Sequence, residues 1–274
     1  MSIIPKHFLD AVVSLGVKNP SNTFWVGTGF IVGRREEGNP NLSTFYIVTN
    51  KHVVSNRDKI EVRFNNENST NVKDYTAPLV INGTKVYSEH PNINVDVIAI
   101  QINANLLISD KSKWSAYDLE SNTLTLEQMK STGVDEGTHV YTLGFPMNLV
   151  GNFNNSPICR SGCISRVYDA FSMVEKAESF LVDAQAFPGN SGGPVINRPE
   201  IVSIQGTPYN SKANLIGILS AYIPYRDVLV SRQTQQETMI LTENSGLTIV
   251  HPVDRIKEVV ENEYLRASKF KDAK

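Results

Sequence analysis

Cysteine is scarce in this sequence of 274 residues, which contains only Cys159 and Cys163. The segment around them, Ser156 to Arg166, has the composition of a β-strand, on which positions four residues apart lie ~13 Å from each other. A disulfide requires Cα atoms within ~7 Å, so we expect two free thiols. Free thiols in an otherwise cysteine-free chain are typical of a reducing compartment, and we therefore expect a cytoplasmic protein.

Long apolar runs and an excess of one charge are also lacking. No stretch approaches the ~20 apolar residues that span a bilayer, and the N-terminal segment Met1 to Val17 lacks the features of a signal peptide. Lysine and arginine number 26 against 28 acidic residues. A nearly balanced charge argues against nucleic acid or a membrane as the main partner. No Cys or His spacing resembles a metal-ligand set, so we expect no metal and no cofactor.

Short runs of β-branched and aromatic residues do occur throughout, separated by Gly, Asn, Asp, Pro and Ser. This pattern predicts an all-β protein. The expected strands are Phe24 to Val32, Thr44 to Thr49, Ile60 to Phe64, Val95 to Ile102, His139 to Gly144, Cys163 to Val167, Phe180 to Ala184, Ile201 to Gln205, Leu215 to Ser220 and Leu247 to Val250.

The pattern lapses over Asp118 to Gly137, which we interpret as a linker between residues 1–118 and 119–250. Residues 251–274 have helical spacing after Pro252, with acid early and base late, which predicts a helix packed on the second half. The polar stretch Tyr225 to Gly246 is expected to form a mobile excursion.

The strongest chemical signal is Phe187 to Pro194, FPGNSGGP. Glycines on both sides of Ser191 leave its hydroxyl unshielded and let backbone N–H groups converge on one point. A serine hydroxyl alone is a weak nucleophile, so it requires a base. Among five histidines, His52 is singled out by its place at the end of an expected strand, in IVTNKHVV. Asp96, at the head of the strand in NVDVIAIQ, is the candidate for orienting that histidine.

With its motifs in this order, the chain resembles the trypsin-like serine peptidases, and most closely the HtrA (DegP) group of bacterial proteases. The matching blocks include GTGFIV, TNKHVV, DVIAIQI, GCISR and GNSGGPV. The resemblance implies two packed six-stranded antiparallel β-barrels, the chymotrypsin-like fold, with a C-terminal helix. It implies a serine endopeptidase that cleaves protein or peptide substrates.

The same resemblance assigns the site residues. Ser191 is the nucleophile, His52 the general base and Asp96 its orienting partner, with Ser220 supporting the aspartate. The N–H groups of Gly189 and Ser191 form the oxyanion hole. Ala221 and Tyr222 bind an extended substrate by strand pairing. Gln185 is expected at the base of the primary pocket, which favours small or aliphatic side chains over basic ones.

Two departures from the family accompany the resemblance. Asn190 precedes the nucleophile where zymogen-activated members have an aspartate, so activation by a newly cut N-terminus is not expected. The HtrA group usually has a C-terminal PDZ module, whereas only a helix follows Val250 here. Recognition beyond the cleft must then come from loops or from another protein. Because a protease without a secretory signal would endanger its host unless it is restrained, a regulatory protein partner is a further hypothesis.

Other functions remain open at the level of the sequence. One alternative is a catalytically inactive protein that keeps the trypsin fold and binds peptides or acts as a scaffold. Another is an esterase, because Gly189 to Gly193 literally satisfies the Gly-x-Ser-x-Gly string. That motif belongs to an α/β sheet, however, and the chain lacks the βα alternation.

Overall fold

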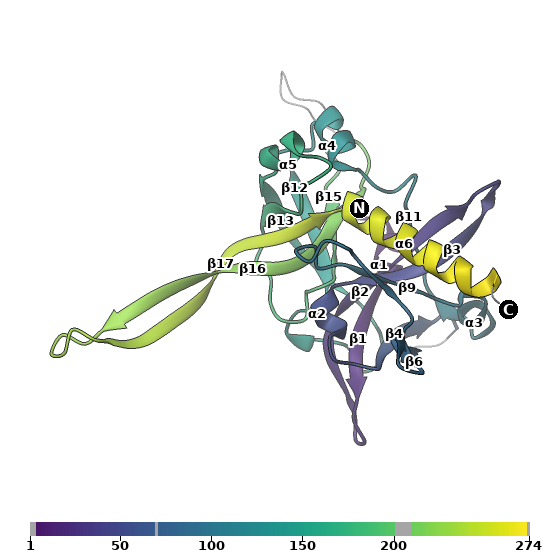
Figure 1. The fold of residues 1–274 in the computed structure, drawn as a ribbon, viewed down its shortest axis with the longest axis horizontal. Coiled ribbons are helices and arrows are strands. Elements are labelled where there is room, and N and C mark those ends of the chain that lie inside the picture. Colours follow the sequence, from purple (N-terminus) through teal and green to yellow (C-terminus); the bar gives the residue numbers. More distant parts are fainter. Residues whose placement is uncertain (1–3, 69–70, 201–209, 273–274) are drawn as a thin grey trace.

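The computed structural model describes residues 4–68, 71–200 and 210–272, and it consists mainly of β-strands arranged in two halves (Figure 1). Within these residues, no helix has both the length and the apolar character needed to cross a membrane. The expected strand Ile201 to Gln205 lies outside the described residues.

The first half is built on a nine-stranded sheet with the path β10-β4-β1-β2-β3-β9-β8, to which β5 adds beside β4 and β11 beside β2. Six of these strands contain four or more residues, and six is the number of strands predicted for this barrel. The other three contain only two residues each. The strands are β1 (Val12–Lys18), β2 (Thr23–Glu36), β3 (Asn39–Thr49), β4 (Lys59–Asn66), β5 (Val72–Pro78), β8 (Ser88–Glu89), β9 (Ile98–Gln101), β10 (Ser112–Lys113) and β11 (Tyr117–Asp118). A small hairpin and three short helices complete this half: β6 (Val80–Ile81), β7 (Thr84–Lys85), α1 (Lys6–Asp10), α2 (Lys51–Val54) and α3 (Ala104–Ser109).

The second half is a closed barrel of six strands in the order β12-β13-β14-β17-β16-β15. These strands are β12 (His139–Gly144), β13 (Ile158–Arg166), β14 (Phe180–Asp183), β15 (Pro194–Asn197), β16 (Leu215–Val230) and β17 (Glu237–Pro252). The short helices are α4 (Leu126–Thr132), η1 (Pro146–Asn148) and α5 (Tyr168–Ser172). The predicted fold class, an all-β chymotrypsin-like double barrel with a terminal helix, is confirmed. Cys159 and Cys163 are free thiols.

The segment expected to be a linker, Asp118 to Gly137, is partly helical because it contains α4. Thr125 and Gln128 form a reciprocal capping box at the N-terminus of this helix, and Gly133 ends it in the left-handed conformation. The polar character of this segment therefore reflects a capped surface helix beside a loop. The division into domains at this segment stays a prediction.

Helix α6 (Val253–Asp272) lies across both halves (Figure 1). Its buried residues Val253, Ile256, Val259 and Val260 belong to one core cluster with residues of the first sheet and of the second barrel. Polar contacts bind it to the first half as well, since Ser88 donates to Glu263 and Arg34 to Glu261. The sequence predicts that this helix packs on the second half. The helix packs on the first half as well, because its apolar stripe is wide enough to contact both halves.

Residues Tyr225 to Gly246, expected to be a mobile excursion, instead form the outer part of a long β16–β17 hairpin (Figure 1). The two strands pair from Pro224 opposite Asn244 to Val230 opposite Glu237. The sequence analysis did not predict these strands because neither face of the hairpin packs on the core, so polar and apolar residues do not alternate along it.

Candidate active site

The sequence places Ser191 in a pair of tight turns, and the structure shows how the glycines make them. Asn190 N–H donates to the carbonyl of Phe187 (2.9 Å), which closes a turn with Pro188 second and Gly189 third at φ +97°. Gly193 N–H donates to the carbonyl of Asn190 (2.9 Å), with Gly192 at φ +86°. Both are turns that require a positive φ at the third residue.

Glycine at positions 189 and 192 is also required by space. A Cβ on Gly189 would lie 2.2 Å from the carbonyl oxygen of Phe145, and one on Gly192 would lie 2.0 Å from that of Thr28. In the described part of the chain, the N–H groups of Gly189 and Ser191 donate to no protein acceptor. Two unpaired amide donors in the turn that carries a serine are the kind of groups that form an oxyanion hole.

Thr28 on β2 holds this turn, and the sequence analysis did not identify it. Its Oγ1 donates to the carbonyl of Gly189 (2.6 Å) and accepts from Phe145 N–H (3.1 Å). Its backbone N–H donates to the carbonyl of Ser191 (2.9 Å). Thr28 therefore fixes the Ser191 turn of the second half against the first half. The block GTGFIV contains this residue, although a threonine in a strand gives no sign of such a role.

His52 and Asp96 meet at the boundary of the two halves. His52 lies on the short helix α2 directly after β3, and its Nδ1 is 2.5 Å from Asp96 Oδ2. The backbone N–H of His52 donates to the other carboxylate oxygen, Oδ1 (3.2 Å). The predicted pairing of this histidine with this aspartate is thus present in the geometry.

Asp96 is fixed by further hydrogen bonds on every side. Ser220 Oγ on β16 donates to Oδ2 (3.0 Å), and Asn50 Nδ2 donates to the backbone carbonyl (2.6 Å). Burial alone would raise the pKa of Asp96, but hydrogen bonds and charge from His52, with the Ser220 bond, outweigh it and lower the pKa. The carboxylate is therefore ionised at neutral pH and can orient an imidazole.

A second histidine, His251, supports Asp96 from behind. His251 Nε2 accepts from the backbone N–H of Asp96 (3.1 Å), and its Nδ1 lies 2.6 Å from the carbonyl of Glu178. Since a carbonyl only accepts, Nδ1 carries the proton and Nε2 is the lone-pair acceptor. Burial lowers the pKa of His251, which favours this neutral form. Nothing in the sequence around His251 pointed to this contact.

Ser191 and His52 line the same cavity of about 480 Å³, together with the predicted binding residues Ala221 and Tyr222. Its other lining residues include Val26, Ala186, Phe187 and Leu219, and none carries a carboxylate. The Ser191 hydroxyl is turned to the backbone carbonyl of Ser220 (3.1 Å) and not to His52.

Gln185 does not reach this cavity. Its side chain is exposed, and its Oε1 accepts from Arg160 (3.4 Å). The neighbours Ala184 and Ala186 are buried, so the alternation of an extended chain turns Gln185 outward. The prediction is off by one residue, because the next residue, Ala186, does line the cavity.

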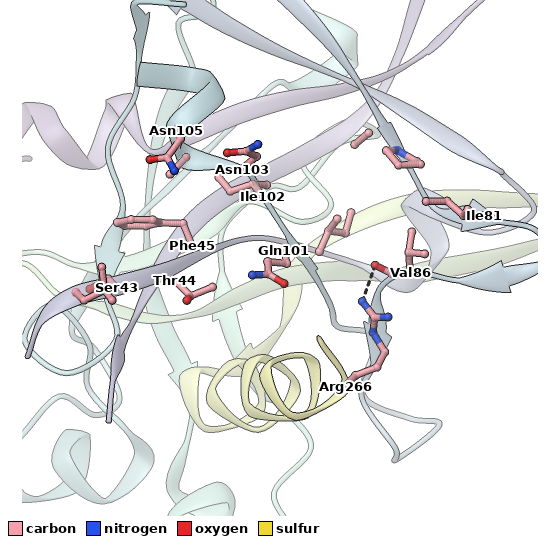
Figure 2. Close-up of a pocket in the computed structure, with 15 residues that line it drawn as sticks. Ser43, Thr44, Phe45, Ile81, Val86, Gln101, Ile102, Asn103, Asn105 and Arg266 are labelled. Atoms are coloured by element: carbon pink, nitrogen blue, oxygen red, sulfur yellow. Dashed lines mark hydrogen bonds between the residues drawn. The ribbon is translucent and has the colours of Figure 1, made fainter. Parts of the chain in front are cut away.

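A larger cavity, about 660 Å³, lies in the first half between β3, β5 and β9 and shares no residue with the one at Ser191 (Figure 2). Its only titratable lining residue is Arg266, which donates to Glu263 and to the carbonyl of Val86. Its lining includes the hydroxyls of Ser43 and Thr44 but no histidine or carboxylate that could act as a base, so the cavity near Ser191 is the candidate active site. Among the described residues, no three His, Cys, Asp or Glu side chains gather as a metal site.

Comparison with known proteins assigns the family. The sequence profile described as "Trypsin-like peptidase domain" matches residues 27–200, which is more than half of the chain. This chain belongs to the trypsin-like peptidase family. The resemblance found in the sequence is thereby confirmed, and the matched residues include His52, Asp96 and Ser191.

Known relatives place this trypsin-like peptidase domain near the HtrA group. "Serine protease HtrA-like" of Staphylococcus aureus strain USA300 is 24% identical over 232 residues, which cover 80% of this chain and 22% of that protein. The counterpart in strain MRSA252 is 24% identical over 231 residues. The chain thus spans about a fifth of the length of these relatives.

Among solved structures, "HtrA-type protease AlgW with decapeptide" superposes with a TM-score of 0.53 at 17% identity, over 94% of this chain and 66% of that one. At this identity the likeness concerns the fold.

Proposed function

We propose that this trypsin-like peptidase domain is an active serine endopeptidase with Ser191, His52 and Asp96 as its catalytic triad. The observation that carries the proposal is that His52, which is bonded to Asp96, lines one cavity with Ser191, and that the N–H groups of Gly189 and Ser191 have no acceptor among the described residues. Family membership alone would also fit a domain that had lost these groups.

The geometry suggests how each group acts. His52 Nδ1–H donates to Asp96, which leaves Nε2 free to take the Ser191 proton. The serine oxygen then bonds to the substrate carbonyl carbon, and the displaced electron pair settles on an oxyanion held by the N–H groups of Gly189 and Ser191. His52 then gives this proton to the amine nitrogen as the carbon–nitrogen bond breaks, which leaves an acyl group on the Ser191 oxygen. In the second stage, water gives a proton to His52 and attacks the acyl carbon, the ester bond to Ser191 breaks, and the serine oxygen takes the proton back from His52.

Substitution of the triad tests the proposal. Ser191→Ala and His52→Ala should each lower kcat for a cleaved peptide on the order of a millionfold, because neither partner works alone. The control is Ser55→Ala, an exposed serine just after helix α2. Peptide cleavage that survives in the Ser191 or His52 variant would refute the assignment.

For the substrate, we propose an extended peptide that pairs with β16 at Ala221 and Tyr222 and places a small or aliphatic side chain before the cut bond. The apolar lining of the cavity, with no carboxylate, supports this choice. A cleavage profile over a randomised peptide library would check it, and a dominant preference for Lys or Arg would exclude it.

The rival function, an inactive peptide-binding or scaffold protein, has one observation in its favour. The Ser191 hydroxyl donates to Ser220 and so is not activated by His52 in this conformation. Catalytic hydrogen bonds often tighten only when substrate binds, so this contact does not outweigh the rest of the site. The contact is also consistent with the proposed regulation by another protein. In that case a partner or a substrate would turn the Ser191 hydroxyl from Ser220 toward His52.

A further inference from the structure

The outer part of the β16–β17 hairpin, residues 224–230 and 237–244, forms an arm that stands away from the barrel (Figure 1). Within the described residues these two segments pair only with each other: β14 joins β17 at 247–250, and β15 joins β16 at 215–218. A two-stranded ribbon without further support is marginally stable in water. We therefore expect contact with another protein chain to stabilise the arm.

The arm exposes large apolar side chains on both faces. Tyr225, Val228, Leu229, Val230, Met239, Ile240 and Leu241 are 39% to 58% exposed. Val228 stands opposite Ile240, and the next pair, Leu229 opposite Met239, faces the other side. Single exposed apolar residues are ordinary, whereas a contiguous group of them marks an interaction surface.

The two edges of the arm differ in a way that selects one of them. The β16 edge carries Pro224, Arg226 and Asp227, and proline and charge are the features that block the addition of another strand. Over its length in the arm, the β17 edge carries charge only at Glu237 and Glu243, and the five residues between them contain neither proline nor charge. The β17 edge therefore offers the longer uninterrupted stretch for another strand.

The open edge has a sequence that complements itself. Thr238-Met239-Ile240-Leu241-Thr242 reads as threonine, apolar, isoleucine, apolar, threonine in both directions. In an antiparallel pair of two copies centred on Ile240, Ile240 faces Ile240, Met239 faces Leu241, and Thr238 faces Thr242. Apolar and threonine pairs of this kind stabilise a sheet. The next position would set Glu237 against Glu243, and this repulsion limits the pairing to five residues.

We propose that the arm is a dimerisation element that binds a second copy of this chain. The two β17 edges pair about a twofold axis at Ile240 and form a four-stranded sheet in the order β16-β17-β17-β16. A surface that matches itself is what a twofold dimer requires. Because each chain contributes one short strand, the interface is small, and we expect a dissociation constant in the micromolar range.

Sedimentation velocity over a range of concentrations tests the dimer. The wild-type chain should pass from monomer to dimer, and Ile240→Lys should raise the dissociation constant by at least about tenfold because it sets two like charges opposite each other. Val228→Lys is the matched control: its side chain is also exposed and lies on the same face, but on the β16 strand. It should leave dimerisation nearly unchanged.

Oxidative cross-linking tests the register, in a background with Cys159→Ser and Cys163→Ser. Ile240→Cys should form a disulfide-linked dimer, since opposed Cα atoms at ~4.5 to 5.5 Å suit a disulfide. Val228→Cys should not, because its two copies would lie three strand spacings, ~14 Å, apart.

Several results would overturn the proposal. These are a wild-type chain that stays monomeric at several hundred micromolar, a dimer that Ile240→Lys leaves intact, a Val228→Lys variant as impaired as Ile240→Lys, and equal cross-linking at both positions. Circular dichroism of each lysine variant separates loss of the dimer from loss of the fold.

Discussion

At the scale of single residues, the site depends on how firmly Asp96 is held. The sequence predicted two of its side-chain partners, His52 and Ser220, from the resemblance to the family. It did not identify Asn50 and His251, which hold the backbone of Asp96 from behind. A histidine that acts through a backbone N–H has no motif, since the contact depends on where the end of β17 lies relative to the loop before β9.

His251→Gln is expected to reduce the dependence of stability on pH. Burial lowers the pKa of His251, and its ionisable neighbours are Asp96, His90 and Glu178. The unfolded chain therefore binds a proton at this residue first as the pH falls below ~6.5, and the free energy of unfolding drops by up to about 1.4 kcal/mol per pH unit. Glutamine keeps an acceptor for Asp96 N–H and does not titrate.

Urea unfolding at pH 7.5 and pH 5.5 measures this effect. The wild-type chain should lose more stability on acidification than the His251→Gln variant. His139→Gln, a change at an exposed histidine, should behave as the wild type. An equal acid-induced loss in all three proteins would show that His251 is not buried in its neutral form.

At the scale of elements, the periodic spacing of hydrophobic residues predicted helix α6 and most strands. It did not predict the two strands of the arm. Residues Val253, Ile256, Val260 and Tyr264 have helical spacing because one face of α6 packs on the core. The outer hairpin has no buried face, so its sequence lacks the alternation that reveals a strand. Its pairing follows from the turn and from the strands that continue out of the barrel.

Ile256→Ala is expected to destabilise the whole protein by about 2–5 kcal/mol, because Ile256 is fully buried in the cluster shared by both halves. Leu265→Ala on the same helix, at a side chain 50% exposed, should cost less than about 0.5 kcal/mol. Chemical denaturation provides both values. Similar costs for the two variants would mean that α6 does not join the halves.

At the scale of the whole molecule, the candidate site requires two halves in a fixed relation, and several polar contacts fix it. Thr28 binds the Ser191 turn from the first half, and Asn155 reaches the first half from the loop before β13. Asn155 Oδ1 accepts from Ser14 Oγ (2.8 Å), and Nδ2 donates to the carbonyl of Val12 (3.1 Å). The sequence indicated two halves, but contacts between residues more than a hundred positions apart have no local signature.

Asn155→Ala should lower the free energy of unfolding by roughly 2–3 kcal/mol, since it leaves Ser14 and the Val12 carbonyl buried without partners. The neighbour Asn154 is exposed, and Asn154→Ala should have little effect. Thermal unfolding of both variants compares them directly. A loss as large in Asn154→Ala would assign the effect to the loop and not to the contact between halves.

The central claim is that Ser191 is a nucleophile activated by His52, and labelling with a fluorophosphonate probe tests it most directly. Intact mass and peptide mapping should show one phosphonyl group per chain, attached to Ser191, with labelling abolished in Ser191→Ala and strongly slowed in His52→Ala. An unlabelled wild-type chain that is fully folded and binds peptide, or a label that persists in the Ser191→Ala variant, would contradict the account.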